Sequence, residues 1–142
     1  MNYDKDLQRL QVRSRSRECL NYFRMNGDTQ VQQELINNGY GRVMSITFCT
    51  AGGIGEELDK KIYYGLYHIS WFIREQHEGR TYGQQSFQPL PLLARQTEEQ
   101  LEEEGANEEI ETQLINNGYN GNIKYYANKA KAWILNRFIH KY

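Results

Sequence analysis

Apolar residues recur at three- and four-residue intervals along most of this chain, which is the spacing that an amphipathic helix requires. The clearest example predicts a long helix ending before Gly79, through the unbroken stripe Leu58, Ile62, Leu66, Ile69 and Ile73. Weaker stripes predict helices from Asp4 or Asp6 to about Met25, from about Gln30 to near Thr50, from Pro91 to just before Gly105, from Asn107 to about 114 and from 121 to 141. The helix from about Gln30 is expected to be capped by Asp28 or Thr29, Pro91 to lie in the first turn of its helix, and Asn107 to cap the short helix that follows. The sequence therefore predicts an all-α fold, a compact bundle of five to six amphipathic helices, in one domain spanning residues 1–142.

The segment Leu-Ile-Asn-Asn-Gly-Tyr occurs twice, at 35–40 and at 114–119, and each copy closes one apolar stripe and opens another. Asn and Gly tolerate the left-handed backbone conformation in which many helices end, so each copy is interpreted as a junction between two helices. Alternatively, Gly39 and Gly118 lie inside continuous helices, where a neighbouring helix approaches closely. The repetition suggests two similar helical halves.

Residues 43–50, which read VMSITFCT, are rich in β-branched and aromatic side chains and are compatible with a buried strand. A helix is the preferred interpretation, because Tyr40, Val43 and Thr47 keep a three-four spacing. The glycine-rich residues 52–55 that follow resemble a phosphate cradle. They are interpreted as a flexible turn, since the two glutamates directly after them would repel a phosphate.

The composition is typical of a folded soluble domain, with 142 residues, a net charge of -1 and 39% hydrophobic residues. No apolar run approaches the ~20 residues of a membrane-spanning helix, and Met1–Asp6 leads directly into a charged helix rather than a signal peptide. We therefore expect a cytoplasmic protein with no membrane partner. Cys19 and Cys49 show no CxxC or Cys/His spacing and are interpreted as buried free thiols.

Charge is distributed unevenly, with basic ends and an acidic belt between them. Residues 119–142 carry five basic side chains and no acidic one, whereas residues 98–111 carry eight glutamates and no basic side chain. The acidic belt is interpreted as an exposed or partner-facing surface. Opposite charges on different faces would favour head-to-tail contacts between copies of the chain.

A basic stripe on the first predicted helix is the strongest functional signal. Its members fall within one arc of the helix and are Lys5, Arg9, Arg13, Arg17 and Arg24. Like charges four residues apart disfavour an isolated helix, so the stripe is easier to explain if an anion lies against it. A nucleic-acid backbone fits, because it needs only positive charges at intervals. The track would be extended by Arg42, Lys124, Lys131 and Arg137.

Two alternatives to a nucleic-acid backbone remain open for the basic stripe. It can pair with glutamates, either those at 98–111 of its own chain or those of a protein partner, or it can be an ordinary solvated face. The chain lacks the aromatic signature of a base-reading RNA-recognition motif, so any RNA binding is expected to be independent of base sequence.

The sequence contains no recognisable catalytic, metal or cofactor site. His68, His77 and His140 lack partners at metal-binding spacing, and His68 is interpreted as a structural histidine. The chain also lacks HExxH, nucleophile-elbow and dinucleotide-binding signatures. We therefore expect a protein that is not an enzyme, binds no metal and uses no cofactor.

Several segments together resemble one known family. Ile36–Tyr40 followed by residues 43–48, the apolar helix that contains Trp71, and the basic helix Ala127–Lys141 around Trp133 are similar to the small helical subunit of type III-B (Cmr-type) CRISPR effector complexes. The chain departs from the family motif at Tyr40, where the family has Leu. The resemblance implies a non-catalytic subunit that stacks head-to-tail and lines the channel of the guide–target RNA duplex with basic side chains.

The sequence thus predicts an RNA-binding scaffold subunit of a ribonucleoprotein that also contacts other effector subunits. In this hypothesis, backbone phosphates are neutralised first by Arg9, Arg13, Arg17 and Arg24 and secondarily by Arg42, Lys124, Lys131 and Arg137. The alternative is a small oligomeric interaction protein, such as a phage-encoded inhibitor or a nucleotide-binding sponge of bacterial defence. In that case the tyrosines and the polar loop at 79–91 would form a pocket.

Overall fold

The computed structural model describes residues 17–49, 56–81 and 85–139, with side chains at all of these positions except 48–49, 56–57 and 135–139. A helix occupies residues 17–26. It is followed by α2 (Thr29–Asn37), α3 (Tyr40–Cys49), α4 (Glu56–Glu78), α5 (Pro91–Glu103), α6 (Ala106–Gln113) and α7 (Asn122–Ile139). The all-α prediction is confirmed, and residues 43–49 are helix rather than strand. The described residues form seven helical segments instead of five to six, because the predicted helix at 30–50 is divided in two.

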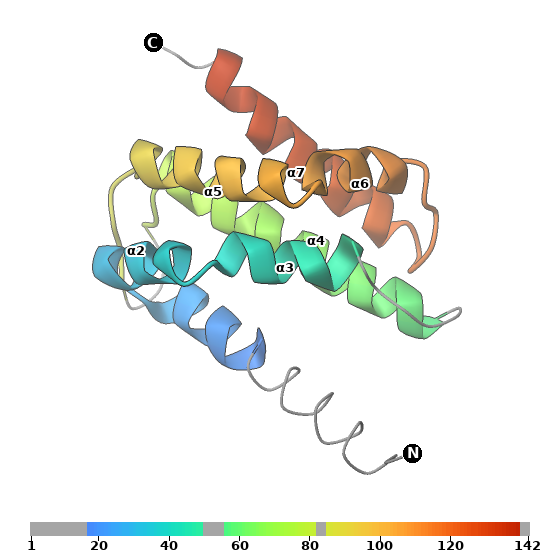
Figure 1. Ribbon diagram of the computed structural model, residues 1–142, viewed down its shortest axis with the longest axis horizontal. Helices are drawn as coiled ribbons and strands as arrows, with labels where there is room; N and C mark the ends of the chain where they lie inside the picture. Colours follow the sequence, from blue (N-terminus) through green and yellow to red (C-terminus); the bar gives the residue numbers. More distant parts are fainter. Residues whose placement is uncertain (1–16, 50–55, 82–84, 140–142) are drawn as a thin grey trace.

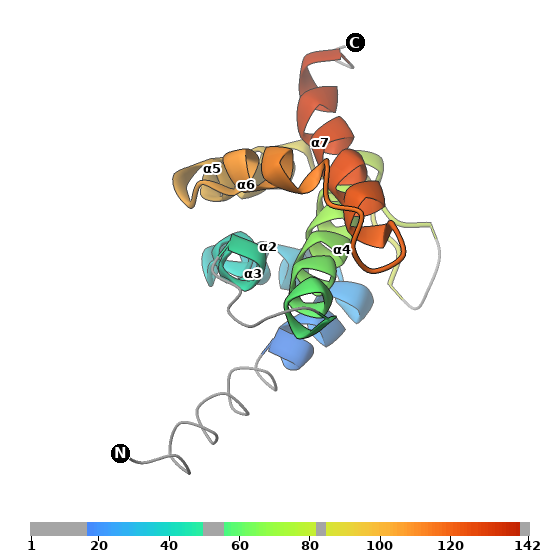
Figure 2. The same cartoon turned by 90° about the vertical axis from the view of Figure 1, so that its right-hand side faces the viewer.

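Helices α2, α3, α5 and α6 form two rows beside α4 (Figures 1 and 2). In Figure 1, α2 and α3 run end to end in one row, and α5 and α6 run end to end in the row above it. Helix α4 packs against α3, α5 and α7, while α7 also packs against α6. No described helix is long and apolar enough to cross a membrane.

The apolar stripe of α4 forms the centre of the core, as its spacing predicts. Leu66, Ile69 and Ile73 are fully buried, and Ile62 is 5% exposed. Burying one such side chain contributes about 1.5–3 kcal/mol, so this stripe is a major source of stability. The other helices surround it with the buried residues Leu35, Ile36, Tyr40, Met44, Leu93, Leu101, Ala106, Ile110, Ile123, Ala127 and Ala130.

The two copies of the repeated segment adopt different conformations. In the first copy Gly39 is left-handed, with a φ of 79°, and the chain enters α3 at the fully buried Tyr40. In the second copy the left-handed residue is Tyr119, which is 40% exposed, and the two residues directly after the copy, Asn120 and Gly121, are left-handed as well. Both copies end a helix, so the junction interpretation is confirmed and the continuous-helix alternative is wrong. The different conformations of the two copies give no support to the prediction of two similar helical halves.

The helix ends agree with the sequence prediction at Asp28 and Pro91 and differ from it at Asn107. Asp28 caps α2 by accepting a hydrogen bond from the Val31 N–H at 3.0 Å, and Pro91 lies in the first turn of α5, both as predicted. The predicted cap at Asn107 is wrong, because the N-cap of α6 is Gly105 in a left-handed conformation. The glycine-rich residues 52–55 lie outside the described part of the chain.

The prediction that Cys19 is a buried thiol is wrong. This cysteine is exposed, not buried, and it is free of any disulfide. The side chain of Cys49 lies outside the described residues, so the buried thiol predicted there stays a prediction.

Candidate nucleic-acid interface

The predicted basic track is only partly visible in the structure. Arg9 and Arg13 lie outside the described residues, and so does the side chain of Arg137. Arg17 is partly exposed at the start of the described helix, and Lys124 is exposed on α7. For these residues phosphate binding stays a prediction.

Arg24 does not lie on the exposed basic face that the sequence predicts. It is 3% exposed, and its Nη1 atom lies 2.7 Å from Oε1 of Glu75 on α4. Its Nη2 atom lies 3.2 Å from Nδ1 of His68, also on α4. The prediction for Arg24 is therefore wrong, because this end of the helix at 17–26 packs against α4 and buries the guanidinium with a carboxylate.

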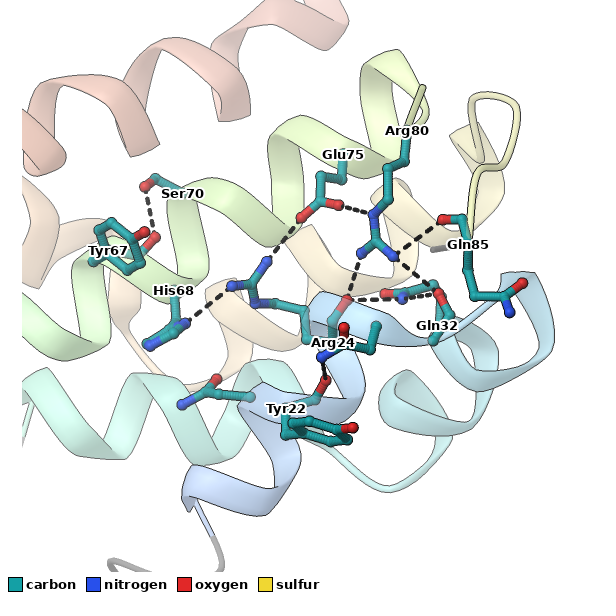
Figure 3. A network of polar contacts seen from close by, with 12 residues as sticks. Tyr22, Arg24, Gln32, Tyr67, His68, Ser70, Glu75, Arg80 and Gln85 are labelled. Carbon is teal, nitrogen blue, oxygen red and sulfur yellow. Dashed lines mark hydrogen bonds and ion pairs between the residues drawn. The ribbon is translucent and has the colours of Figure 1, made fainter. Parts of the chain in front are cut away.

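Arg24, Glu75 and Arg80 form a buried arginine–glutamate cluster (Figure 3). Arg80 is 2% exposed, and its Nε donates to the second carboxylate oxygen of Glu75. Its remaining N–H groups donate to main-chain carbonyl oxygens of Arg24, Gly27 and Gln85. One carboxylate thus faces two guanidinium groups, and main-chain oxygens accept from Arg80. The cluster joins the helix at 17–26, α4 and the segment after α4, which makes its role structural.

Two neighbouring polar groups are held in their neutral forms. Burial, and then the nearby Arg24 charge, lower the pKa of His68 from 6.5 to about 3, so its neutral ring faces the guanidinium. The Tyr40 hydroxyl donates to Asn21 Oδ1 at 2.6 Å, and burial raises the pKa of Tyr40. The predicted structural role of His68 is confirmed, since it is 8% exposed and bonded within the core.

Two other predicted cations are paired with the acidic belt. Arg42 lies 2.9 Å from Glu104 and 3.5 Å from Glu103, and Nζ of Lys131 lies 2.6 Å from Glu111. The internal pairing proposed as an alternative for the basic stripe therefore applies to these two residues. Such exposed pairs contribute about 0–1 kcal/mol each to stability, and the positive charges of Arg42 and Lys131 are offset by the protein's own carboxylates.

Helix α7 presents exposed cations with aromatic side chains between them. It contains four basic residues and no acidic one. Lys124 and Lys129 are exposed, Tyr125 is 52% exposed, and Asn128 donates a hydrogen bond to the main-chain oxygen of Lys124 at 3.0 Å. Among the described residues, no ion pair within 4 Å joins Lys124 or Lys129 to a carboxylate. This surface is called the basic face of α7 below.

A cleft of about 220 Å³ separates α4 from α7 next to this face. Its walls are Ser70, Trp71, Arg74, Tyr125, Tyr126, Lys129 and Trp133, and we call it the α4/α7 cleft. The Arg74 guanidinium carbon lies 4.9 Å from the centre of the Trp71 ring, and Lys129 Nζ lies 5.3 Å from that of Tyr125. Each cation therefore makes a cation–π contact beside the cleft.

A cluster of aromatic rings packs against Tyr126, one of the wall residues of the cleft. The Tyr126 ring meets Tyr63 and Tyr67 edge to face, with centroids 5.6 and 5.1 Å apart, and Tyr63 stacks on Tyr119 at 4.6 Å. Burial, together with the neighbouring tyrosines, raises the pKa of both Tyr63 and Tyr126. These hydroxyls stay neutral at physiological pH, so the cleft carries its formal charge on Arg74 and Lys129.

Sequence reasoning missed this cleft. Trp71 and Trp133 were interpreted only as parts of apolar helix faces. Of the predicted pocket loop at 79–91, the described residues include Arg80, a member of the arginine–glutamate cluster, and Gln85, whose main-chain oxygen accepts from Arg80. The available signal was the spacing of Trp71–Arg74 and of Tyr125 with Lys129, which places a ring and a cation on one side of each helix. The described residues contain no group of three His, Cys, Asp or Glu placed to hold a metal.

Comparison with protein-family models, curated proteins and solved structures finds no match to this chain. The resemblance to the small subunit of type III-B CRISPR effector complexes therefore stays a prediction.

Proposed function

We propose that this protein binds single-stranded RNA through the basic face of α7 and catalyses no reaction on it. The observation that carries the proposal is the exposure of Lys124 and Lys129 on a helix that has no acidic residue. By contrast, Arg24, Arg42 and Lys131, the last of which is also on α7, all face carboxylates of the protein itself. Lys124 and Lys129 of α7 are therefore available to an external anion.

The aromatic side chains on this face favour RNA over an acidic protein as the partner. Proteins that bind single strands without sequence preference combine cations that track the backbone with rings on which bases stack. Tyr125 lies between Lys124 and Asn128 in the chain and exposes half of its surface. An acidic protein surface needs the charges and makes no comparable use of an exposed ring.

The test is a titration of fluorescently labelled RNA with the full chain, followed by anisotropy. With an oligomer of about 30 nucleotides at about 50 mM salt we expect binding, with log affinity falling linearly against log salt by about 0.7 per neutralised phosphate. The double substitution Lys124→Ala/Lys129→Ala should reduce that slope by about 1.4.

A charge-matched control is Arg42→Ala/Arg95→Ala, which removes two exposed cations that pair with the protein's own glutamates. It should leave the slope nearly unchanged. No binding at low salt would refute the proposal, and an equal loss in both double variants would move the interface away from α7. A further variant, Arg9→Ala/Arg13→Ala, tests the basic stripe predicted from the sequence in the same assay.

A further inference from the structure

The α4/α7 cleft combines two kinds of side chain that a nucleotide uses at once. Four of its seven wall residues are aromatic, and they include both tryptophans of the chain, Trp71 and Trp133. Two more are the cations Arg74 and Lys129, one from each helix. Rings of this kind stack on nucleobases, whereas guanidinium and ammonium groups attract phosphates.

The rings of the cleft are fixed before any ligand arrives. The Trp71 ring lies 6.4 Å from the Tyr67 ring, and the Tyr67 ring also meets the Tyr126 ring edge to face. The Trp133 ring stacks on His77 with centroids 6.1 Å apart and planes 20° apart, and His77 lies 3.0 Å from Glu98. Preorganised rings lose little conformational freedom on binding, which favours a planar ligand.

The size of the cleft limits what it can hold. Its volume of about 220 Å³ is below the roughly 300–1,000 Å³ of sites that enclose drug-sized ligands. A single planar ring system fits such a space, and a dinucleotide or an extended organic cofactor does not.

The cations of the cleft are available to a phosphate. Lys129 is exposed, and Arg74, besides its contact with the Trp71 ring, forms an ion pair with Glu78 at 3.2 Å through side chains that are each about half exposed. An exposed pair one helical turn apart is weak, so the guanidinium can turn toward an anion. An apolar ligand would make no use of these charges, and an acidic peptide would make little use of four rings.

We infer that the α4/α7 cleft is a nucleobase site, in which one base stacks against the aromatic walls while its phosphate lies near Arg74 and Lys129. The inference rests on the proposed function, since RNA bound along α7 would deliver the base; a free mononucleotide has the same chemistry and is the other source. The cleft adds base-dependent affinity to the base-independent attraction of the basic face of α7.

Tryptophan fluorescence gives a direct readout, because both tryptophans line the cleft. The experiment titrates the full chain with oligoadenylate RNA and with an abasic ribose-phosphate oligomer of equal length and charge. We expect oligoadenylate to quench the emission and to bind about tenfold more tightly than the abasic oligomer, as loss of one stacked base predicts. Equal quenching and equal affinity for the two oligomers would overturn the inference and leave backbone binding intact.

Matched variants separate stacking and charge from general effects. Tyr125→Ala should remove most of the difference between the two oligomers, while Tyr22→Ala, at a residue that is 64% exposed far from the cleft in sequence, should not. Arg74→Ala should weaken oligoadenylate binding several-fold, and Arg95→Ala, which breaks the equivalent exposed pair on α5, should not. If the two members of either pair behave alike, the cleft is not the site.

Adenosine monophosphate identifies the source of the base. Quenching by oligoadenylate at concentrations far below those needed for the mononucleotide indicates RNA. If RNA does not bind but the mononucleotide quenches, the proposed function fails while the cleft remains a nucleobase site. If neither quenches, the inference fails as well.

Discussion

Replacing Glu75 by glutamine keeps the size of the side chain but removes its negative charge from between two buried guanidinium groups. Glu75 is 5% exposed, and its two carboxylate oxygens accept from Arg24 and Arg80. Glutamine would place an NH₂ group, itself a donor, against one of these donors. The change therefore removes the counter-charge and creates one donor–donor contact without leaving a cavity.

The expected loss of stability is large because neither guanidinium can reach water. Breaking a buried ion pair by removing one partner costs about 3–5 kcal/mol, and a domain of this size is stable by about 5–15 kcal/mol. At about 2–4 °C per kcal/mol, the melting temperature should fall by about 6–20 °C. The main-chain oxygens that accept from Arg80 keep its other N–H groups satisfied, so we expect no more than this range.

The assay is urea unfolding followed by circular dichroism, with thermal melts in parallel. Glu99→Gln is the matched control, because it makes the same chemical change in an exposed pair, in which Glu99 lies 3.6 Å from Arg95. It should alter the free energy of unfolding by less than about 0.5 kcal/mol. A loss below about 1 kcal/mol for Glu75→Gln, or an equal loss in both variants, would refute the charge argument.

Three further changes test neighbouring features by the same unfolding measurements. His68 stays neutral in the folded chain down to about pH 3 but protonates near pH 6.5 in the unfolded chain, so its contribution to the free energy of unfolding is complete above pH 6.5 and is lost as the pH falls toward 3. About 2 kcal/mol of the free energy of unfolding should be lost between pH 7 and pH 5, and His68→Gln should abolish that part of the pH dependence. Tyr40→Phe should cost about 1–3 kcal/mol, because Asn21 Oδ1 loses its donor in a buried site; Tyr119→Phe, at the exposed second copy, should cost under about 0.5 kcal/mol. Gly39→Ala should lower the free energy of unfolding by about 1–2 kcal/mol, because alanine disfavours the positive φ at this position and not because its Cβ would clash. Gly39→Asn should cost less, since asparagine tolerates a positive φ, and an equal loss for the two variants would contradict this reason.

The sequence predicted the elements whose determinants are local. The stripe of α4, the cap at Asp28 and the proline at the start of α5 each depend on residues within one or two turns, and each lies where the spacing placed it. The division between α2 and α3 was left open because a glycine can end a helix or allow close packing within one. The structure decides it through the positive φ of Gly39.

The candidate site depended on contacts between distant parts of the chain. Arg24 shares a helical arc with other arginines, but its partner Glu75 lies 51 positions away, and periodicity carries no information on such a pair. The cleft likewise arises where α4 meets α7, so residues of both helices become neighbours only after folding. The positive charge of α7 could be predicted, since residues 119–142 contain basic residues and no acidic one.

The arginine–glutamate cluster also has a consequence for the kinetics of folding. The bonds that join Arg24 to Glu75, and Arg80 to Arg24 and Gly27, connect residues 51 to 56 positions apart, so they form only after a long loop has closed and several helices have met. Contacts of this kind are expected to be absent from the transition state, and their loss then accelerates unfolding without slowing refolding. The cluster would thus form after the transition state and slow unfolding, which sets the lifetime of the native state. A chevron plot of Glu75→Gln should shift almost entirely in its unfolding limb.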